Sequence, residues 1–175
     1  QQGRPSTIVS RDKDLTQLLR GDDVFWDFAG KGKLRYEEIK GSFGVRPEQI
    51  ADFLALAGDA VDNIKGVPGV GKKTAEKLLQ HFGTLDDIYG NLHRVHEVNV
   101  RGAKTLAAKL DTHRDAAMLA RRLTCIACDA PIDDAETLLQ PAAPKLGDIN
   151  ALFDEAGIGT ALRRQAERVS DIYRH

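Results

Sequence analysis

The feature that most constrains this chain is a glycine-rich run from Gly66 to Lys73, with the sequence Gly-Val-Pro-Gly-Val-Gly-Lys-Lys. Glycine adopts backbone conformations that tight turns need and that other residues adopt only with strain. Valines alternate with these glycines and are suited to burial. Directly afterwards, apolar residues recur at helical spacing from Thr74 to Phe82. The run therefore predicts a backbone hairpin that leads straight into an amphipathic helix.

The start of that helix is a suitable place for an anion. Gly69 and Gly71 leave backbone N–H groups uncovered by side chains, and a helix N-terminus carries partial positive charge. Lys72 and Lys73 add two full charges there. Such a device binds backbone phosphates and does not read base sequence. We expect DNA binding that weakens as salt rises; the alternative is a plain Gly/Pro turn between two helices.

The overall composition says little about this expectation, but the local charge agrees with it. The formal net charge is −1, yet residues 63–109 contain eight Lys/Arg against four Asp/Glu. No apolar run approaches the roughly 20 residues that cross a bilayer, and the first five residues lack the apolar core of a signal peptide. Two cysteines without a disulfide framework are typical of a reducing compartment. We expect a monomeric, cytoplasmic protein with no membrane partner.

The first 30 residues follow a β-α-β order. Strands are expected at Thr7–Ser10 and Val24–Phe28, with a short helix from Asp14 to Leu19 between them. This order is typical of an open parallel sheet, which is buried on both faces and needs more than two strands. We therefore expect strands upstream of Gln1 to complete the sheet. A small α+β domain that begins here is the alternative.

After Lys33 the pattern becomes helical, and three parts of the chain are expected. A partial α/β core occupies residues 1–35 and a helical region occupies 36–123. Residues 124–175 hold a strand at Thr124–Cys128 that returns to the sheet, an extended connection over 129–148 and one amphipathic helix from Ile149. The helices expected in the helical region are Tyr36–Phe43, Glu48–Ala57, Thr74–Phe82, one that begins at Thr84, Ala103–Leu110 and Asp115–Leu123.

Two pairs of aspartates stand out. Asp12 and Asp14 follow the first strand and can point the same way at its carboxyl end, where α/β sheets bind ligands. Asp59 and Asp62 lie three residues apart, just before the hairpin. Carboxylates without nearby histidine suit hard cations such as Mg²⁺ or Mn²⁺, which catalyse phosphodiester cleavage. Alternatively, Asp14 is a helix N-cap and Asp62 caps the hairpin turn.

Five motifs follow one another along the chain: Ser10–Leu19, Phe43–Gln49, Ala57–Ile64, the helix–three-turn–helix at 66–79 and Arg101–Thr105. In this order they resemble the bacterial 5′–3′ exonucleases and flap endonucleases, the family that includes the nuclease domain of DNA polymerase I. The resemblance runs from about Ser6 to Ile132. It implies an α/β fold in which this chain is the C-terminal part of a PIN-like nuclease core, with a mainly helical SAM-like helix-hairpin-helix region that binds DNA.

The resemblance also implies roles for individual residues. Divalent metal ligands are Asp12, Asp14, Asp59 and Asp62, the last two at the second metal position. The backbone carbonyls of Val67 and Val70 are the implied donors to a K⁺ ion between hairpin and phosphate. The residues implied to contact DNA are Gly69, Gly71, Lys72, Lys73, Thr74, Arg101 and Lys104.

The implied activity is that of a structure-specific 5′ nuclease, a metal-dependent exonuclease or flap endonuclease acting on 5′ flaps, nicks or gapped duplex. The N-terminal half of the family domain is absent from these residues, so we expect the chain alone to be incomplete for catalysis. The competing hypothesis is a non-catalytic DNA-structure-binding module that keeps the nuclease scaffold. Retention of all four aspartates favours the nuclease. The short basic ending after Asp148 favours a free-standing enzyme over a polymerase linker.

Other candidate residues have simpler interpretations. Cys125-x-x-Cys128 with His93-x-x-His96 has the ligand types for zinc, but the cysteines are expected in a buried strand and the histidines in a distant loop. The alternating aromatics Phe25, Trp26 and Phe28 are expected in the strand core. The arginines of the last helix, expected on its solvated face, are Arg163, Arg164 and Arg168.

Overall fold

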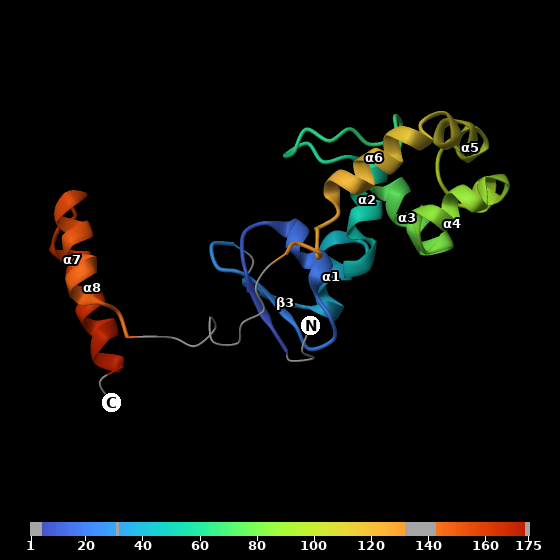
Figure 1. Ribbon diagram of the computed structural model, residues 1–175. Helices are drawn as coiled ribbons and strands as arrows, with labels where there is room; N and C mark the ends of the chain where they lie inside the picture. The colour runs from blue at the N-terminus through green and yellow to red at the C-terminus, as the bar shows by residue number, and fades with distance from the viewer. Residues whose placement is uncertain (1–4, 31, 132–142, 174–175) are drawn as a thin grey trace. The chain divides into compact units, whose positions relative to one another are not determined.

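The structure is a computed structural model that describes residues 5–30, 32–131 and 143–173 (Figure 1). The chain divides into two compact units, Gln1–Cys128 and Asp129–His175. Most of the expected extended connection over 129–148 lies outside the described residues. None of the described helices has the length and apolar character needed to cross a membrane. The candidate residues for DNA and metal all belong to the first unit.

A three-stranded sheet opens the first unit. Strand β1 (Thr7–Val9) pairs in parallel with β2 (Val24–Asp27), and a 3-10 helix, η1 (Lys13–Leu18), lies between them. The expected β-α-β order is therefore present. A third strand, β3 (Gly32–Arg35), pairs antiparallel with β2 and was not predicted. Its sequence has a single large apolar residue, so it carries too weak a pattern to be recognised as a strand.

The aromatic residues of β2 do not form one core, contrary to expectation. Phe25 is buried, but Trp26 is 38% exposed and Phe28 is 61% exposed. Successive residues of a strand point to opposite faces. Phe25 therefore faces the packed side with its partner Leu34, while Trp26 pairs with Lys33 on the other side. There the Lys33 ammonium lies 5.1 Å from the centre of the Trp26 ring.

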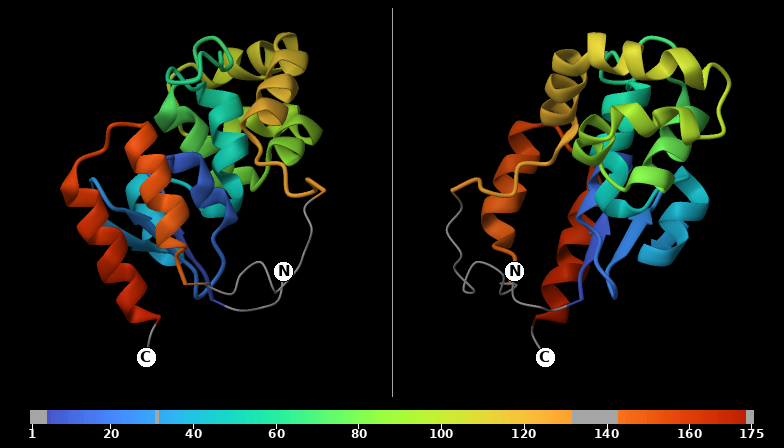
Figure 2. Two further views of the ribbon diagram at one scale, coloured as in Figure 1. Left: turned by 60° about the vertical axis from the view of Figure 1, so that its left-hand side comes forward. Right: turned by 90° about the vertical axis from the view of Figure 1, so that its right-hand side faces the viewer.

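Most helices of the first unit lie beyond the end of the sheet at which β1 leads into η1 (Figure 2). Helix α1 (Tyr36–Phe43) ends at Gly44, whose φ of 83° suits glycine. Pro47 begins a short 3-10 helix, η2 (Pro47–Gln49), which runs into α2 (Ile50–Ala57). Helix α2 packs against η1, α3 (Lys72–Phe82) and α6 (Arg114–Thr124), and its residues Phe53 to Leu56 are all buried. It is the central helix of the first unit.

Four more helices and a 3-10 turn complete the first unit, close to their expected positions. The expected bounds were short by two residues at the start of α3 and by one or two residues at the ends of α5 and α6. The short 3-10 turn was not expected. The elements are α3 (Lys72–Phe82), α4 (Leu85–Gly90), η3 (Leu92–Glu97), α5 (Ala103–Thr112) and α6 (Arg114–Thr124).

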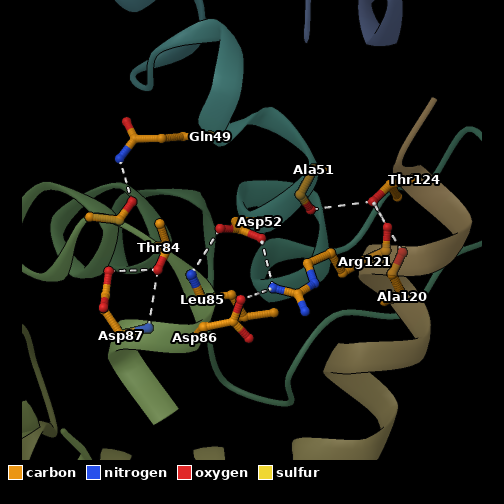
Figure 3. Close-up of polar contacts among 11 residues, drawn as sticks. Gln49, Ala51, Asp52, Thr84, Leu85, Asp86, Asp87, Ala120, Arg121 and Thr124 are labelled. Carbon is orange, nitrogen blue, oxygen red and sulfur yellow. Dashed lines mark hydrogen bonds and ion pairs between the residues drawn. The ribbon is translucent and has the colours of Figure 1, made fainter. Parts of the chain in front are cut away.

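Polar side chains in and next to α2 hold these helices in place (Figure 3). The buried Gln49 amide donates to the carbonyls of Leu79 (3.1 Å) and Gly83 (2.7 Å), at the C-terminus of α3. The Asp52 carboxylate accepts the N–H of Leu85 (2.8 Å), at the N-terminus of α4. Arg121 lies 2.8 Å from Asp86 and 3.7 Å from Asp52, so it joins α6 to both. Burial raises the pKa of Asp52, against the opposing effects of the Leu85 N–H and of Arg121.

The expected strand at Thr124–Cys128 is wrong. Thr124 is the last residue of α6, and its hydroxyl donates within hydrogen-bond distance to the carbonyl of Ala120 (3.0 Å). Among the described residues, 125–131 form neither helix nor strand. Both cysteines are exposed, not buried as expected. A short apolar run forms a strand only if a neighbouring strand pairs with it. Here Thr124 instead ends α6, and its side-chain hydrogen bond stabilises the helix.

Among its described residues the second unit holds two helices where one was expected. Helix α7 (Leu146–Glu155) and helix α8 (Thr160–Ile172) are separated by a turn in which Gly157 has a φ of 64°. Arg163 does not lie on a solvated face as expected. It is partly buried, lies 2.6 Å from Asp154 and stacks its guanidinium over the Phe153 ring at 5.6 Å. Arg164 and Arg168 are exposed, as expected.

Candidate functional site

The glycine-rich hairpin is joined to the C-terminus of α2 by direct backbone contact. A Cβ atom on Gly66 would lie 2.3 Å from the backbone nitrogen of Gly58 and 2.5 Å from the carbonyl oxygen of Leu56. The N–H of Val67 donates to that same Leu56 carbonyl at 2.9 Å. Asp59 and Ile64 exchange two backbone hydrogen bonds of 2.8 Å across the intervening turn. The hairpin and the end of α2 therefore form one rigid piece.

The second half of the hairpin sets the start of α3. Val67 and Val70 bury their side chains, and the Val70 N–H donates to the Val67 carbonyl at 2.9 Å. Between them Gly69 has a φ of 82°, which glycine adopts without strain. Gly71 is the N-cap of α3, and Thr74 lies in its first turn. The first N–H groups of a helix have no intrahelical partner, so this end presents donors to solvent.

Three lysines surround that helix start. Lys72 and Lys73 are the first two residues of α3, and both are exposed. Lys109 of α5 is exposed as well, and its Nζ lies 3.2 Å from the position of a Cβ on Gly69. Lys109 was not proposed from the sequence, because a lysine late in a helix carries no local signal of what lies across from it. Positive charge therefore converges on the hairpin from two helices.

Arg101 and Lys104 lie at the beginning of α5. Gly102, with a φ of 78°, is the N-cap of this helix. Both basic side chains are exposed. They belong to the same helical segment as Lys109, which lies beside the hairpin at Gly69. The predicted basic residues thus lie at the first end of α5, and Lys109, near the other end, lies beside the hairpin.

Three of the four predicted aspartates lie together. Asp14 of η1 meets Asp59 and Asp62, which lie between α2 and the hairpin, and each offers a carboxylate oxygen within 4.8 Å of the others. Asp14 and Asp59 are buried, and Asp62 is exposed. Asp12 is outside this group. Its carboxylate accepts the N–H of Asp14 at 3.0 Å and caps η1, so the capping role that the sequence suggested for Asp14 is filled by Asp12.

Lys13 was not predicted from the sequence, and its ammonium enters this carboxylate cluster. Its Nζ lies 2.5 Å from Asp59 Oδ2 and 3.1 Å from Asp14 Oδ1. The contact to Asp14 is close enough for an ion pair but poorly directed for a hydrogen bond, and that buried oxygen has no hydrogen-bond partner among the described residues. The position of Lys13 between two aspartates in the sequence could have indicated this contact.

The charges of the cluster shift one another. Burial raises the pKa of Asp14, and this effect outweighs the opposing one of Lys13. For Asp59, burial also acts to raise the pKa, but the hydrogen bonds from Lys13 and from the N–H of Val61 hold it below its usual value. Burial acts to lower the pKa of Lys13, but its interactions with Asp59 and Asp14 raise that pKa above its usual value. The cluster is therefore a place where positive charge is stabilised.

The carboxylates suit a divalent cation of the hard class. The cluster offers only carboxylate oxygens, and these are the ligand atoms that Mg²⁺ and Mn²⁺ prefer. The buried, poorly satisfied Oδ1 of Asp14 also fits a ligand role. Among the described residues, Cys125, Cys128, His93 and His96 do not form such a group.

One cavity joins the carboxylates to the hairpin. It has a volume of about 1010 Å³. Its wall includes Asp14 and Asp59 from the cluster, and Gly66, Pro68 and Lys72 from the hairpin and the start of α3. A ligand in this cavity would touch both groups at once.

Comparison with known proteins agrees with this geometry. The sequence model of the family described as 5′-3′ exonuclease, C-terminal SAM fold, matches residues 45–146. The chain is 43% identical over 153 residues to DNA polymerase I of Pseudomonas aeruginosa, which covers 87% of this chain and 17% of the polymerase. It is 36% identical over 132 residues to the 5′-3′ exonuclease of Buchnera aphidicola, covering 75% of this chain and 46% of the exonuclease. The chain thus spans about half the length of that exonuclease.

Solved structures share the fold. A mutant of T5 5′-exonuclease superposes with a TM-score of 0.57 at 24% identity, over 67% of this chain and 46% of the other. The bacteriophage T5 D15 flap endonuclease, in a complex with DNA and metal ions, gives 0.57 at 23% identity, over 67% and 42%. The catalytic core of Rad2 with a DNA substrate gives 0.54 at 16% identity, over 93% and 55%.

The family match and these solved structures confirm the predicted α/β fold class, in which a small sheet is joined to a mainly helical region. The family model covers more than half of the chain. The protein therefore belongs to the 5′-3′ exonuclease family and carries that family's C-terminal SAM fold.

Proposed function

We propose that this chain supplies part of the metal site and the duplex-binding hairpin of a structure-specific 5′ nuclease that hydrolyses DNA phosphodiesters. The observation that carries the proposal is the shared cavity, whose wall holds Asp14 and Asp59 as well as Gly66 and Lys72. A DNA backbone bound at the hairpin has a phosphate within reach of the carboxylates. DNA binding and DNA cleavage are thus assigned to neighbouring groups in and around the rigid piece formed by the hairpin and the end of α2.

In this proposal the carboxylates of Asp14, Asp59 and Asp62 hold Mg²⁺ or Mn²⁺. Asp12, at the N-terminus of η1, is proposed as a further ligand. Bound there, the cation supplies the positive charge that activates water and stabilises the leaving oxygen. The Lys13 ammonium is paired with two of these carboxylates, so a bound divalent cation would compete with it for them. Its positive charge then remains available to a nearby phosphate.

The hairpin grips the DNA backbone. The hairpin and the first turn of α3, with Gly69, Gly71, Lys72, Lys73 and Thr74, present backbone N–H groups, the Thr74 hydroxyl and positive charge to phosphate. Lys109 adds a charge from α5, where Arg101 and Lys104 contact the same duplex farther along. The carbonyls of Val67 and Val70 hold K⁺ between the hairpin and the phosphate. The Val67 carbonyl already accepts the N–H of Val70, but a carbonyl oxygen has a second lone pair.

The substrates proposed are 5′ flaps, nicks and gapped duplexes, and the active species is a monomer. Support comes from relatives named 5′-3′ exonuclease and from the T5 flap endonuclease complex with DNA and metal ions. A module that binds DNA structure without cutting it is the alternative. The grouping of Asp14, Asp59 and Asp62 supports the nuclease, because a binding module needs no buried carboxylates at its phosphate site.

The test uses this chain in one polypeptide with the N-terminal half of the family domain, because the chain alone is expected to be incomplete for catalysis, and measures cleavage of a 5′-flap substrate, labelled at the flap, with and without Mg²⁺. The change Asp59→Asn should abolish metal-dependent cleavage and leave duplex affinity unchanged or tighter. The control is Asp115→Asn, the same change at an exposed residue of α6, which should cleave normally. Full cleavage by Asp59→Asn would contradict the ligand assignment. Duplex binding with no cleavage by the unaltered protein, with or without Mg²⁺, would establish the binding module instead.

A further inference from the structure

The chain that leaves α6 is tied to η1 by one side chain, Gln17. Its amide nitrogen donates to the carbonyl of Thr124 and its amide oxygen accepts the N–H of Ile126, both at 3.0 Å. These bonds join residues more than 100 positions apart in sequence. Gln17 is partly buried and belongs to the same short helix as Lys13 and Asp14. The position of that helix is therefore sensitive to the conformation of the chain at Ile126.

Two thiols flank Ile126. Cys125 and Cys128 are both exposed and free. The sulfur of Cys125 lies 3.8 Å from the carbonyl oxygen of Ile126, and the sulfur of Cys128 lies 3.5 Å from the same oxygen. The distance between the two sulfurs is therefore at most the sum of these two distances. Residues 126–131 belong to no helix or strand, so this segment can bend at small cost.

We propose that Cys125 and Cys128 are a redox-active thiol pair, and that Gln17 transmits the state of this pair to the carboxylates of the proposed metal site. The oxidant is a low-molecular-weight disulfide. The thiolate of one cysteine attacks it and displaces one thiolate, which leaves a mixed disulfide on the protein. The second cysteine, as its thiolate, attacks that mixed disulfide and displaces the other small thiolate. The protein loses two S–H bonds and gains one S–S bond, while the small disulfide is reduced to two thiols.

Closing the disulfide moves Ile126. The S–S bond is about 2.05 Å long and brings the two Cα atoms within roughly 7 Å, so the backbone must turn at Ile126 and Ala127. Such a turn takes the Ile126 N–H away from the oxygen of Gln17. Helix η1 then loses part of its attachment to the chain after α6, and Asp14 is held less firmly. Loss of the groups that orient metal ligands lowers metal affinity about tenfold or more.

Thiol chemistry is tested first, without reference to metal. The protein is equilibrated in mixtures of oxidised and reduced glutathione, alkylated with iodoacetamide and weighed by mass spectrometry. We expect Cys125 and Cys128 to become protected together, with a mass loss of two hydrogens. The variant Cys128→Ser should instead collect one glutathione on Cys125. Separate glutathione adducts on each cysteine of the unaltered protein, with no internal disulfide, would overturn the proposal.

The coupling rests on the proposed metal site and is tested by Mn²⁺ binding, followed by the electron paramagnetic resonance signal of free Mn²⁺. Oxidation should weaken binding about tenfold. Reduced Gln17→Met should show the same weakening and respond no further to oxidation, with the double change Cys125→Ser/Cys128→Ser as the redox-inert control. Equal affinity of the reduced and oxidised protein would refute the coupling. Absence of Mn²⁺ binding in both states would refute the proposed metal site, and the mass measurement would still decide the thiol pair.

Discussion

The contact between Gly66 and the end of α2 can be tested with a single methyl group. In Gly66→Ala the new Cβ would lie 2.3 Å from the nitrogen of Gly58 and 2.5 Å from the oxygen of Leu56. These are backbone atoms, so no side-chain rotation relieves the overlap. The hairpin and α2 must separate by about 1 Å to regain ordinary van der Waals contact. We expect this change to be strongly destabilising although it adds only one carbon.

Two terms give the magnitude. Separation lengthens the bond from the Val67 N–H to the Leu56 carbonyl, now 2.9 Å, and losing such a bond costs about 1 kcal/mol. Forcing one extra carbon into a packed contact costs about 1–3 kcal/mol. The free energy of unfolding should therefore fall by about 2–4 kcal/mol, which lowers Tm by roughly 10 °C for a domain of this size. Duplex affinity should also fall, because the hairpin no longer keeps its position beside Asp59.

The matched control is Gly71→Ala in the same hairpin. Gly71 has a φ of −87°, and a Cβ there would meet nothing within 4 Å. Its stability should stay within about 0.5 kcal/mol of the unaltered protein. Urea unfolding of both variants, followed by circular dichroism, makes the comparison. If Gly66→Ala were as stable as Gly71→Ala, the close backbone contact would not exist in solution, and the hairpin and α2 would not form one rigid piece.

Three further predictions concern the helical region. Gln49→Met removes the donor to the Gly83 carbonyl and should cost about 1–3 kcal/mol in urea unfolding, since the Leu79 carbonyl keeps its helical partner; an unchanged midpoint would refute this clamp. Burial raises the pKa of Asp52 above its ordinary 3.8, so the ionised carboxylate disfavours folding. The free energy of unfolding of the unaltered protein, relative to that of Asp52→Asn, should therefore fall as the pH rises above 3.8 through the folded-state pKa. A difference independent of pH would contradict this prediction. The double change Lys72→Ala/Lys73→Ala should weaken duplex binding and reduce the slope of log K against log salt by about 0.9 for each phosphate that the protein no longer neutralises, and an unaltered slope would argue against phosphate binding by these lysines.

Features set by local chemistry were accessible from the sequence. The hairpin followed from Gly66, Gly69 and Gly71, whose conformational needs do not depend on distant residues. The helices followed from apolar spacing, because burying one face of a helix requires residues at intervals of three and four. The errors at their ends are the residue or two by which caps extend a helix. The proximity of the acidic residues to the hairpin followed from their order along the chain.

Features set by distant residues were not accessible. Nothing near Lys109 indicates that its ammonium lies beside Gly69, since the two are brought together by the packing of α5 and the hairpin. The meeting of Asp14 with Asp59 depends on how η1 packs on α2. The run at Thr124–Cys128 has the composition of a strand, but the Thr124 hydroxyl is bonded within the helix. Only the three-dimensional fold decides such cases.

The ammonium of Lys13 has a consequence for how the protein would take up metal. Two buried carboxylates without a counter-charge would repel each other and oppose folding. With Lys13 paired with both, the protein itself offsets one of the two negative charges and depends less on a bound cation in order to fold. A divalent ion then arrives as a competitor of a tethered lysine, whose effective concentration at the site is fixed by its position in η1. We therefore expect uptake to be an exchange of one cation for another, with an affinity below that of the bare carboxylates.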